Sequence, residues 1–239
     1  MSAKNKKRVL KKKAVLTLVL VGIAAAGVTA AILWKPLSLK YRQHKAEAAF
    51  LDIFEHEEYN WCQMQGIDDY VPVDYMAYSI VYLEDGELPV LFLRLPMGYP
   101  FSAAGPTRMV IYDEESEQCV QIWGEGANSF GIRGFIRQDE DHEYPLVFAD
   151  GGRQDVAYEG IFEFRDNELV RIATKFDIYP YDSDLVSEYH EGHYDEYLWR
   201  DEPVNITEYY TQRGMILNGY QKIDWNFINT QYWGWELEN

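Results

Sequence analysis

The sequence has few cysteines and no excess of glycine. With 2 Cys and 17 Gly in 239 residues, the chain is neither a disulfide scaffold nor a collagen-like protein. An apolar content of 47% and an aromatic content of 15% exclude a disordered tail. A chain of this length forms one domain of ordinary size, with room for a small appendage.

Acidic residues are absent from the first 45 positions. This segment holds 11 of the 22 Lys+Arg and none of the 39 Asp+Glu, so residues 46–239 carry the other 11 bases, every acid and a formal charge of −28. A domain of this charge repels phosphates and has no basic stripe, which excludes nucleic acid as an expected partner. The two parts are therefore predicted to lie in different environments.

Charged residues of either sign are absent from residues 14–34, a run of 21 residues. A helix of that length reaches ~31 Å, which matches the hydrocarbon thickness of a bilayer. Seven Lys/Arg precede the run and four follow it, and this bias places the N-terminus in the cytoplasm. A cleaved signal peptide, cut near residues 28–30, and a buried helix of a soluble domain are the alternatives. A lipoprotein signal is excluded, because no Cys ends the run.

The sequence thus predicts a single-pass protein of the cell membrane that displays its acidic part outside. The predicted parts are a cytoplasmic basic tail (1–13), a transmembrane signal-anchor helix (14–34), a juxtamembrane linker (35–45) and an extracytoplasmic β-rich domain (46–239).

Eight short apolar runs follow one another between residues 78 and 176 and predict paired strands. The expected hairpins are 78–83 with 88–95, 107–112 with 118–123, 131–137 with 145–149, and 156–165 with 168–176. The run at 88–95 is apolar on both faces, as a central strand would be. Asp166-Asn167 is a residue pair suited to a tight primed turn. These runs predict an α+β fold dominated by an antiparallel meander, curled toward a barrel, a sandwich or a partial propeller.

One helix is expected before the meander in the chain and one after it. Apolar residues recur at helical spacing from about Tyr41 to Gln63, and this stripe predicts a helix packed on the sheet. Asn205, with Glu208 three residues later, is typical of a helix start, and the helix is expected to run to about Leu217. Residues 177–203 show little periodicity and are interpreted as a long loop.

The order of these segments resembles a known group of proteins. The segments that carry the likeness are LEDGELPVLFL, DNELVRIATKF, ITEYY and YQKIDW, within about residues 45–228. They resemble uncharacterised surface proteins of clostridia-like Gram-positive bacteria with degenerate FG-GAP or VCBS-type β repeats. This resemblance implies an extracytoplasmic β-rich domain and no catalytic residue. The Asp-rich loop of that pattern is largely missing here, and Val90 stands where the pattern has Glu.

One acidic, histidine-containing segment could hold a metal ion. Two imidazoles three residues apart, with carboxylates around them, could supply ligands to zinc or another divalent cation. The candidate ligands are Glu188, His190, His193 and Asp195. Their spacing matches no established catalytic signature, and a solvated acidic loop with ordinary histidines is the competing interpretation.

Aromatic residues in the same region suggest a binding surface. Exposed aromatic rings can stack on sugars or enter protein interfaces, and the candidates are Tyr189, Tyr194 and Trp199. Core packing in a sheet is the competing interpretation.

Cys62 and Cys119 could form a disulfide outside the cell, or could remain buried thiols.

These observations favour a non-enzymatic binding or interaction module at the cell surface, with a protein, a glycan or a divalent cation as partner. No cofactor beyond that cation is expected. The alternatives are an extracytoplasmic metal-dependent hydrolase that uses residues 188–196 and an accessory subunit of a membrane complex.

Overall fold

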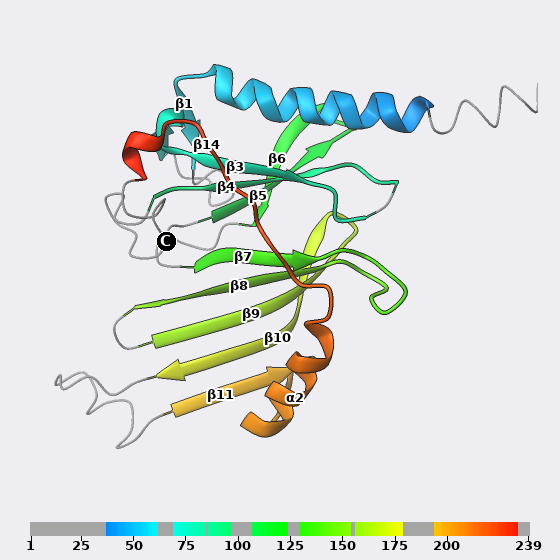
Figure 1. Ribbon diagram of the computed structural model, residues 1–239, viewed down its shortest axis with the longest axis vertical. Coiled ribbons are helices and arrows are strands. Elements are labelled where there is room, and N and C mark those ends of the chain that lie inside the picture. Colours follow the sequence, from blue (N-terminus) through cyan, green and yellow to red (C-terminus); the bar gives the residue numbers. More distant parts are fainter. Residues whose placement is uncertain are drawn as a thin grey trace, which may run out of the picture. The chain divides into compact units, whose positions relative to one another are not determined.

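The computed structural model describes residues 37–61, 69–84, 86–96, 107–123, 130–153, 156–178 and 194–233. The chain divides into two units, Met1–His44 and Lys45–Asn239. Every described strand belongs to the second unit, which contains the sheets and α2 (Ile206–Ile216) shown in Figure 1.

The predicted transmembrane helix requires a correction. Within the described ranges, no helix combines the length and the apolar character needed to cross a membrane. The first helix (residues 37–52) carries lysine, arginine and glutamate, and α2 has only 11 residues, or ~16 Å of helix. The fold class that placed a signal-anchor helix before the sheets is wrong on this finding. Residues 14–34 themselves lie outside the described part.

Two antiparallel sheets form the body of the second unit. A five-stranded sheet has the order β14-β3-β4-β5-β6, and a seven-stranded sheet has the order β12-β11-β10-β9-β8-β7-β13. The first contains β14 (Asn226–Phe227), β3 (Ala77–Val81), β4 (Val90–Arg94), β5 (Thr107–Asp113) and β6 (Gln118–Trp123). The second contains β12 (Glu202–Pro203), β11 (Tyr194–Trp199), β10 (Glu168–Ile178), β9 (Val156–Arg165), β8 (Leu146–Arg153), β7 (Phe130–Ile136) and β13 (Gln221–Lys222).

The four hairpins read from the sequence are present in this arrangement. β3 pairs with β4, β5 with β6, β7 with β8, and β9 with β10, all antiparallel. Asp166 and Asn167 close the β9–β10 hairpin with φ of 52° and 61°, as expected for the primed turn. The strands belong to two sheets rather than to one continuous meander.

The main hydrophobic core contains side chains from both sheets. Val90 and Phe92 of β4 join it from the five-stranded sheet, and Val147 of β8 and Phe162 of β9 join it from the seven-stranded sheet. Neighbouring strand positions point to opposite faces, so Leu91 of β4 belongs instead to a second core. β4 is therefore buried on both faces, as its sequence predicts.

The second core covers the other face of the five-stranded sheet. Ala46, Phe50 and Ile53 are buried there against β4 and β5, which confirms the apolar stripe of the first helix. The predicted C-terminal end of this helix is wrong. The helix stops at residue 52 and is followed by η1 (Ile53–Glu55) and by β1 (Glu58–Asn60), which pairs with β2 (Tyr70–Pro72) before η3 (Val73–Tyr75). Trp61, which the sequence placed in the helix, is buried directly after the end of β1.

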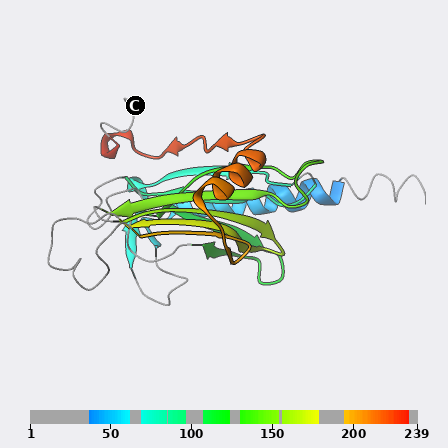
Figure 2. The ribbon, with the colours of Figure 1, turned by 90° about the horizontal axis from the view of Figure 1, so that it is seen from below.

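The third core lies on the outer face of the seven-stranded sheet. Tyr209 of α2 is fully buried there among side chains from β7, β8, β9 and β11. Seen from below, α2 lies across the strands of this sheet (Figure 2). Asn205 caps the helix as predicted, because its side-chain oxygen accepts from the Glu208 backbone N–H at 2.9 Å. After α2 the chain reaches η4 (Thr230–Tyr232).

The interpretation of residues 177–203 as one long loop is partly wrong. β10 continues to Ile178, and residues 194–199 form β11, which pairs with β10 from Ala173↔Trp199 to Ile178↔Tyr194. A short hairpin then leads to β12. The acidic residues 195 and 196 hide the strand in the sequence, because they interrupt the apolar alternation that otherwise marks a strand.

Candidate functional site

The predicted metal ligands lie largely outside the described residues. Glu188, His190 and His193 are in the undescribed segment between β10 and β11, together with Tyr189. Asp195 and Tyr194 are described only by their backbone, in β11. Within the ranges that the structure describes, no group of three or more His, Cys, Asp or Glu side chains could hold a metal ion. The metal site therefore stays a prediction.

Trp199 is the predicted binding residue that the structure places in full. It is the last residue of β11, it is half-buried, and its ring meets the Tyr209 ring edge-on at 6.1 Å. Tyr209 is held by α2, so the helix fixes the indole from one side. The competing interpretation of Trp199, that it only packs in the sheet, explains this contact. It does not explain the pocket that Trp199 also lines.

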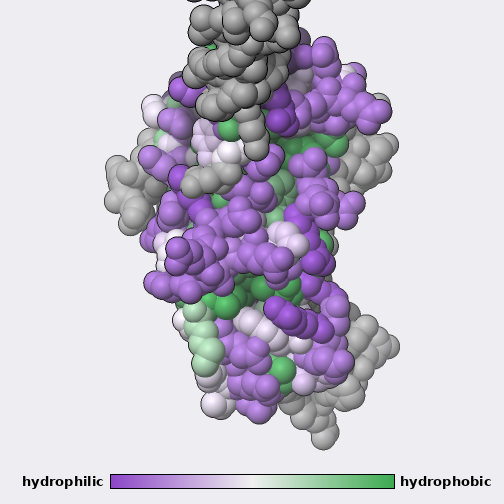
Figure 3. All heavy atoms as spheres, turned by 90° about the vertical axis from the view of Figure 1, so that its right-hand side faces the viewer, coloured by the Kyte–Doolittle hydropathy of each residue, from purple (hydrophilic) through white to green (hydrophobic). Residues whose placement is uncertain are grey.

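The pocket has a volume of about 530 Å³, which lies within the range of small-molecule sites. It is built where the β7–β8 loop, the β9–β10 hairpin, the β11–β12 turn and the end of α2 meet. Its apolar lining consists of Leu146, Val170, Ile172 and Ile216. On the side of the molecule that carries α2, Figure 3 shows hydrophobic atoms at the bottom of a hollow within a mostly hydrophilic surface.

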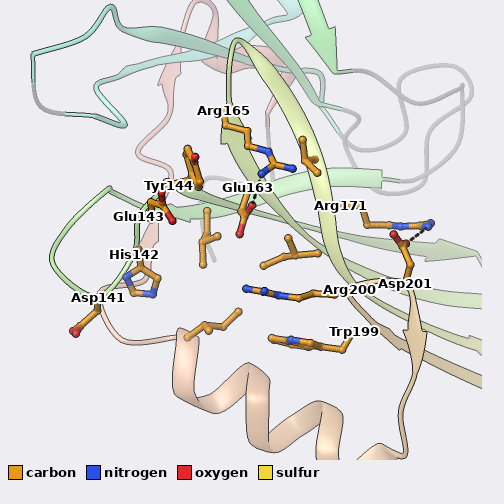
Figure 4. Close-up of a pocket in the computed structure, with 14 residues that line it drawn as sticks. Asp141, His142, Glu143, Tyr144, Glu163, Arg165, Arg171, Trp199, Arg200 and Asp201 are labelled. Atoms are coloured by element: carbon orange, nitrogen blue, oxygen red, sulfur yellow. Dashed lines mark hydrogen bonds and ion pairs between the residues drawn. The ribbon is translucent and has the colours of Figure 1, made fainter.

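Three arginines line the pocket, although residues 46–239 contain only 11 basic residues against 39 acids. Arg165 lies 3.8 Å from a carboxylate oxygen of Glu163 and over the Tyr144 ring at 5.6 Å. Arg171 donates to Asp201 at 2.8 Å. These charges reach the pocket from three separate strands and turns (Figure 4).

Arg200 is the third of these arginines. Its side chain reaches into the pocket from the turn between β11 and β12, above the Trp199 ring in the view of Figure 4. Within the described part of the chain, no carboxylate forms an ion pair with its guanidinium. Its backbone N–H donates to the Ile172 carbonyl at 2.6 Å, which ties the turn to β10.

The turn that presents Arg200 has an uncommon backbone. Arg200 and Asp201 have φ of 51° and 62°, in the left-handed region that glycine and asparagine normally occupy. An L-residue there costs roughly 1–2 kcal/mol. Strain of this kind accumulates at functional sites when the surrounding structure holds it in place.

The opposite wall of the pocket is a loop held by Asp139. Its carboxylate accepts from the backbone N–H groups of Asp141 and His142 at 2.9 and 2.8 Å and contacts the His142 ring nitrogen Nδ1 at 2.9 Å. The interaction with the His142 side chain is the main reason that the pKa of Asp139 lies below its usual value. His142 is nearly buried, so this loop presents a preformed wall.

A charged contact fixes α2 beside the pocket. Arg213 donates to both carboxylate oxygens of Glu159 on β9, at 2.6 and 2.8 Å, and the Tyr209 hydroxyl donates to the same carboxylate at 3.0 Å. The hydrogen bond to Glu159 raises the pKa of Arg213. Burial, followed by the Glu159 charge, raises the pKa of Tyr209. The helix therefore holds Ile216 and the Tyr209 ring against the site through a two-pronged ion pair.

Cys119 lies apart from the pocket, on β6. Burial raises the pKa of its thiol to about 11, so the thiol stays protonated at neutral pH. Cys62 lies outside the described residues, and its pairing with Cys119 stays a prediction.

Sequence reasoning selected Trp199 and missed the arginines around it. No local motif joins Arg165, Arg171 and Arg200, which occupy two strands and a turn. The one signal in the sequence was that basic residues are rare in this strongly acidic domain, so each of them is a candidate for a specific role.

Comparison with protein-family models, with curated proteins and with solved structures finds no match. The pocket is therefore the feature of this protein that points to a function, and the resemblance to FG-GAP or VCBS-type repeats stays a prediction.

Proposed function

We propose that this protein is a non-enzymatic binding module and that it binds a saccharide in the Trp199 pocket. The observation that supports the proposal is a half-buried tryptophan at the edge of a pocket lined by paired arginines and carboxylates. The aromatic face offers an apolar platform for the C–H face of a sugar ring. Guanidinium and carboxylate groups supply the directed hydrogen bonds that hydroxyl groups require.

The charge pattern supports a saccharide over a purely apolar ligand. Glu163 and Asp201 each have an arginine beside them, so hydrogen-bond donors and acceptors lie side by side in the lining. Small-molecule sites combine an apolar base with a few placed polar groups, and this pocket combines four aliphatic residues with such a rim. A glycan is one of the partner classes that the sequence predicts. The placement of the module at the cell surface stays a prediction.

Replacing Trp199 with alanine tests the proposal. The full-length protein should retain one or more saccharides on an array of plant, animal and bacterial oligosaccharides, and Trp199→Ala should weaken that binding by roughly 10-fold or more, because a ring platform contributes on the order of 1–3 kcal/mol. Titration calorimetry with the retained saccharide measures the loss.

Tyr70→Ala is the matched control for this experiment. Tyr70 is an exposed aromatic on β2 that does not line the pocket, so its removal should leave the affinity unchanged. If no saccharide is retained, or if Trp199→Ala binds as tightly as the unmodified protein, the proposed function is wrong.

A further inference from the structure

The charges of the pocket are not all neutralised within it. Arg171 is paired with Asp201, and Arg165 lies beside Glu163. Arg200 points into the same space, and the described residues give it no carboxylate partner. The remaining acidic residues of the lining, Asp141 and Glu143, lie across the pocket from Arg200, beside His142 and Tyr144 (Figure 4).

Several other arginines of the domain have a structural partner. Arg213 forms an ion pair with Glu159, and Arg133 forms one with Asp150. Arg108 is buried and donates to the Trp61 and Thr107 carbonyls. Arg200 differs from these three, because its guanidinium faces a ligand-sized pocket beside an aromatic ring.

The strained turn explains how Arg200 reaches that position. Consecutive residues of a strand point to opposite faces of the sheet, so Trp199 and its successor would normally diverge. Arg200 instead follows the last residue of β11, and with Asp201 it forms a two-residue turn of left-handed φ that keeps Arg200 at the pocket directly after Trp199. Asparagine or glycine would adopt this turn with less strain, but neither carries a guanidinium.

We propose that the ligand of the Trp199 pocket is an acidic saccharide and that Arg200 binds its carboxylate while Trp199 packs against the sugar ring. The inference rests on the proposed function and makes it narrower. The planar fork of an arginine matches a carboxylate through two parallel hydrogen bonds, which a neutral sugar cannot form. Four carboxylates also line the pocket, those of Asp141, Glu143, Glu163 and Asp201, so an acidic ligand must place its own carboxylate beside Arg200 and away from them.

Paired ligands that differ only in charge test this inference. Trisaccharides built on glucuronate, on galacturonate and on a lactyl-ether amino sugar are each prepared as the free acid and as the neutral methyl ester. In calorimetric titrations of the full-length protein, we expect one free acid to bind at least 10-fold more tightly than its ester. We expect added salt to reduce this difference, since screening weakens an exposed ion pair.

Variants of Arg200 and of a control arginine test which residue causes the preference for the acid over the ester. Arg200→Gln should reduce the affinity for the acid by about 10-fold or more and leave the affinity for the ester nearly unchanged. Arg200→Lys should retain part of the preference, because it keeps the charge and loses the fork. Arg137→Gln is the matched control, since Arg137 is exposed, loses the same charge and does not line the pocket.

The outcomes separate the two proposals. Equal binding of acid and ester, an equal loss of both in Arg200→Gln, or an equal loss in Arg137→Gln overturns the acidic-ligand inference and leaves saccharide binding in place. If none of these ligands and no saccharide on the array binds, the proposed function fails and this inference fails with it.

Discussion

At the scale of single residues, the β11–β12 turn holds two residues in an unfavourable backbone conformation. Arg200 and Asp201 both have positive φ, whereas the comparable β9–β10 turn uses Asp166 and Asn167, residue types that tolerate this region well. The arginine is the least suited of the four to its backbone conformation. Under the proposal that Arg200 binds the ligand, this side chain contributes to binding at a cost in stability.

Arg200→Asn should therefore stabilise the protein. Asparagine adopts the left-handed conformation at lower cost, so we expect the free energy of unfolding to rise by about 0.5–1 kcal/mol, which corresponds to ~1–4 °C in the melting temperature. Urea denaturation of the two full-length proteins measures the difference. Asp166→Asn is the control and should change little, because both residue types suit its turn. An unchanged or lower stability of Arg200→Asn would contradict the assignment of strain to this turn.

At the scale of elements, α2 depends on its contacts with the sheet. Its outer surface leaves Ile206, Tyr210 and Met215 exposed, so the helix has no strong apolar stripe. The Asn205 cap fixes its start, and Tyr209 together with the Arg213–Glu159 pair holds it on the seven-stranded sheet. Most of the stability of a helix of 11 residues comes from such packing rather than from helix propensity.

Arg213→Met should loosen this element. The change removes a two-pronged ion pair whose side chains are only 29% and 22% exposed, and it leaves the Glu159 charge partly buried. We expect a loss of about 1–3 kcal/mol in the free energy of unfolding, measured by urea denaturation. Lys45→Met is the matched control, because the Lys45–Glu117 pair is 40% and 66% exposed. Such a pair contributes little, so an equal loss in the two variants would rule out a special role for Arg213.

At the scale of the whole described unit, the two sheets share one core. Phe92 of β4 is fully buried and stacks on Phe135 of β7 with ring centroids 6.4 Å apart, so a side chain of the five-stranded sheet packs on one of the seven-stranded sheet. Removal of either ring is therefore expected to destabilise both sheets together.

Phe92→Ala tests this coupling. Truncation of a buried phenylalanine costs ~3–5 kcal/mol, a large share of the stability of a domain. Thermal unfolding followed by far-UV circular dichroism and by tryptophan fluorescence should give one transition at a lower temperature in both signals. Val120→Ala, on the exposed side of β6, should unfold close to the unmodified protein. Two separate transitions in Phe92→Ala would show that the sheets are stable independently.

The sequence by itself determined the local order of this protein. The continuous apolar run of β4, the Asp166-Asn167 turn and the Asn205 cap depend on residues close together in the chain, so the apolar pattern and the turn and cap chemistry reveal them. The same reasoning placed the end of the first helix and the strand β11 wrongly. In both places, pairing with another strand outweighs the local pattern: β1 pairs with β2, and β11 pairs with β10.

Only the tertiary structure decided the pocket. Trp199 stood out as an aromatic in a polar segment, but its neighbours Arg165, Arg171 and His142 come from other strands and loops. Their approach depends on strand register, on the strained turn at Arg200 and on the docking of α2, none of which is a property of a short segment. A charge-bearing site made of side chains from five parts of the chain exists only once the sheets have paired, because pairing fixes which side chains share a face.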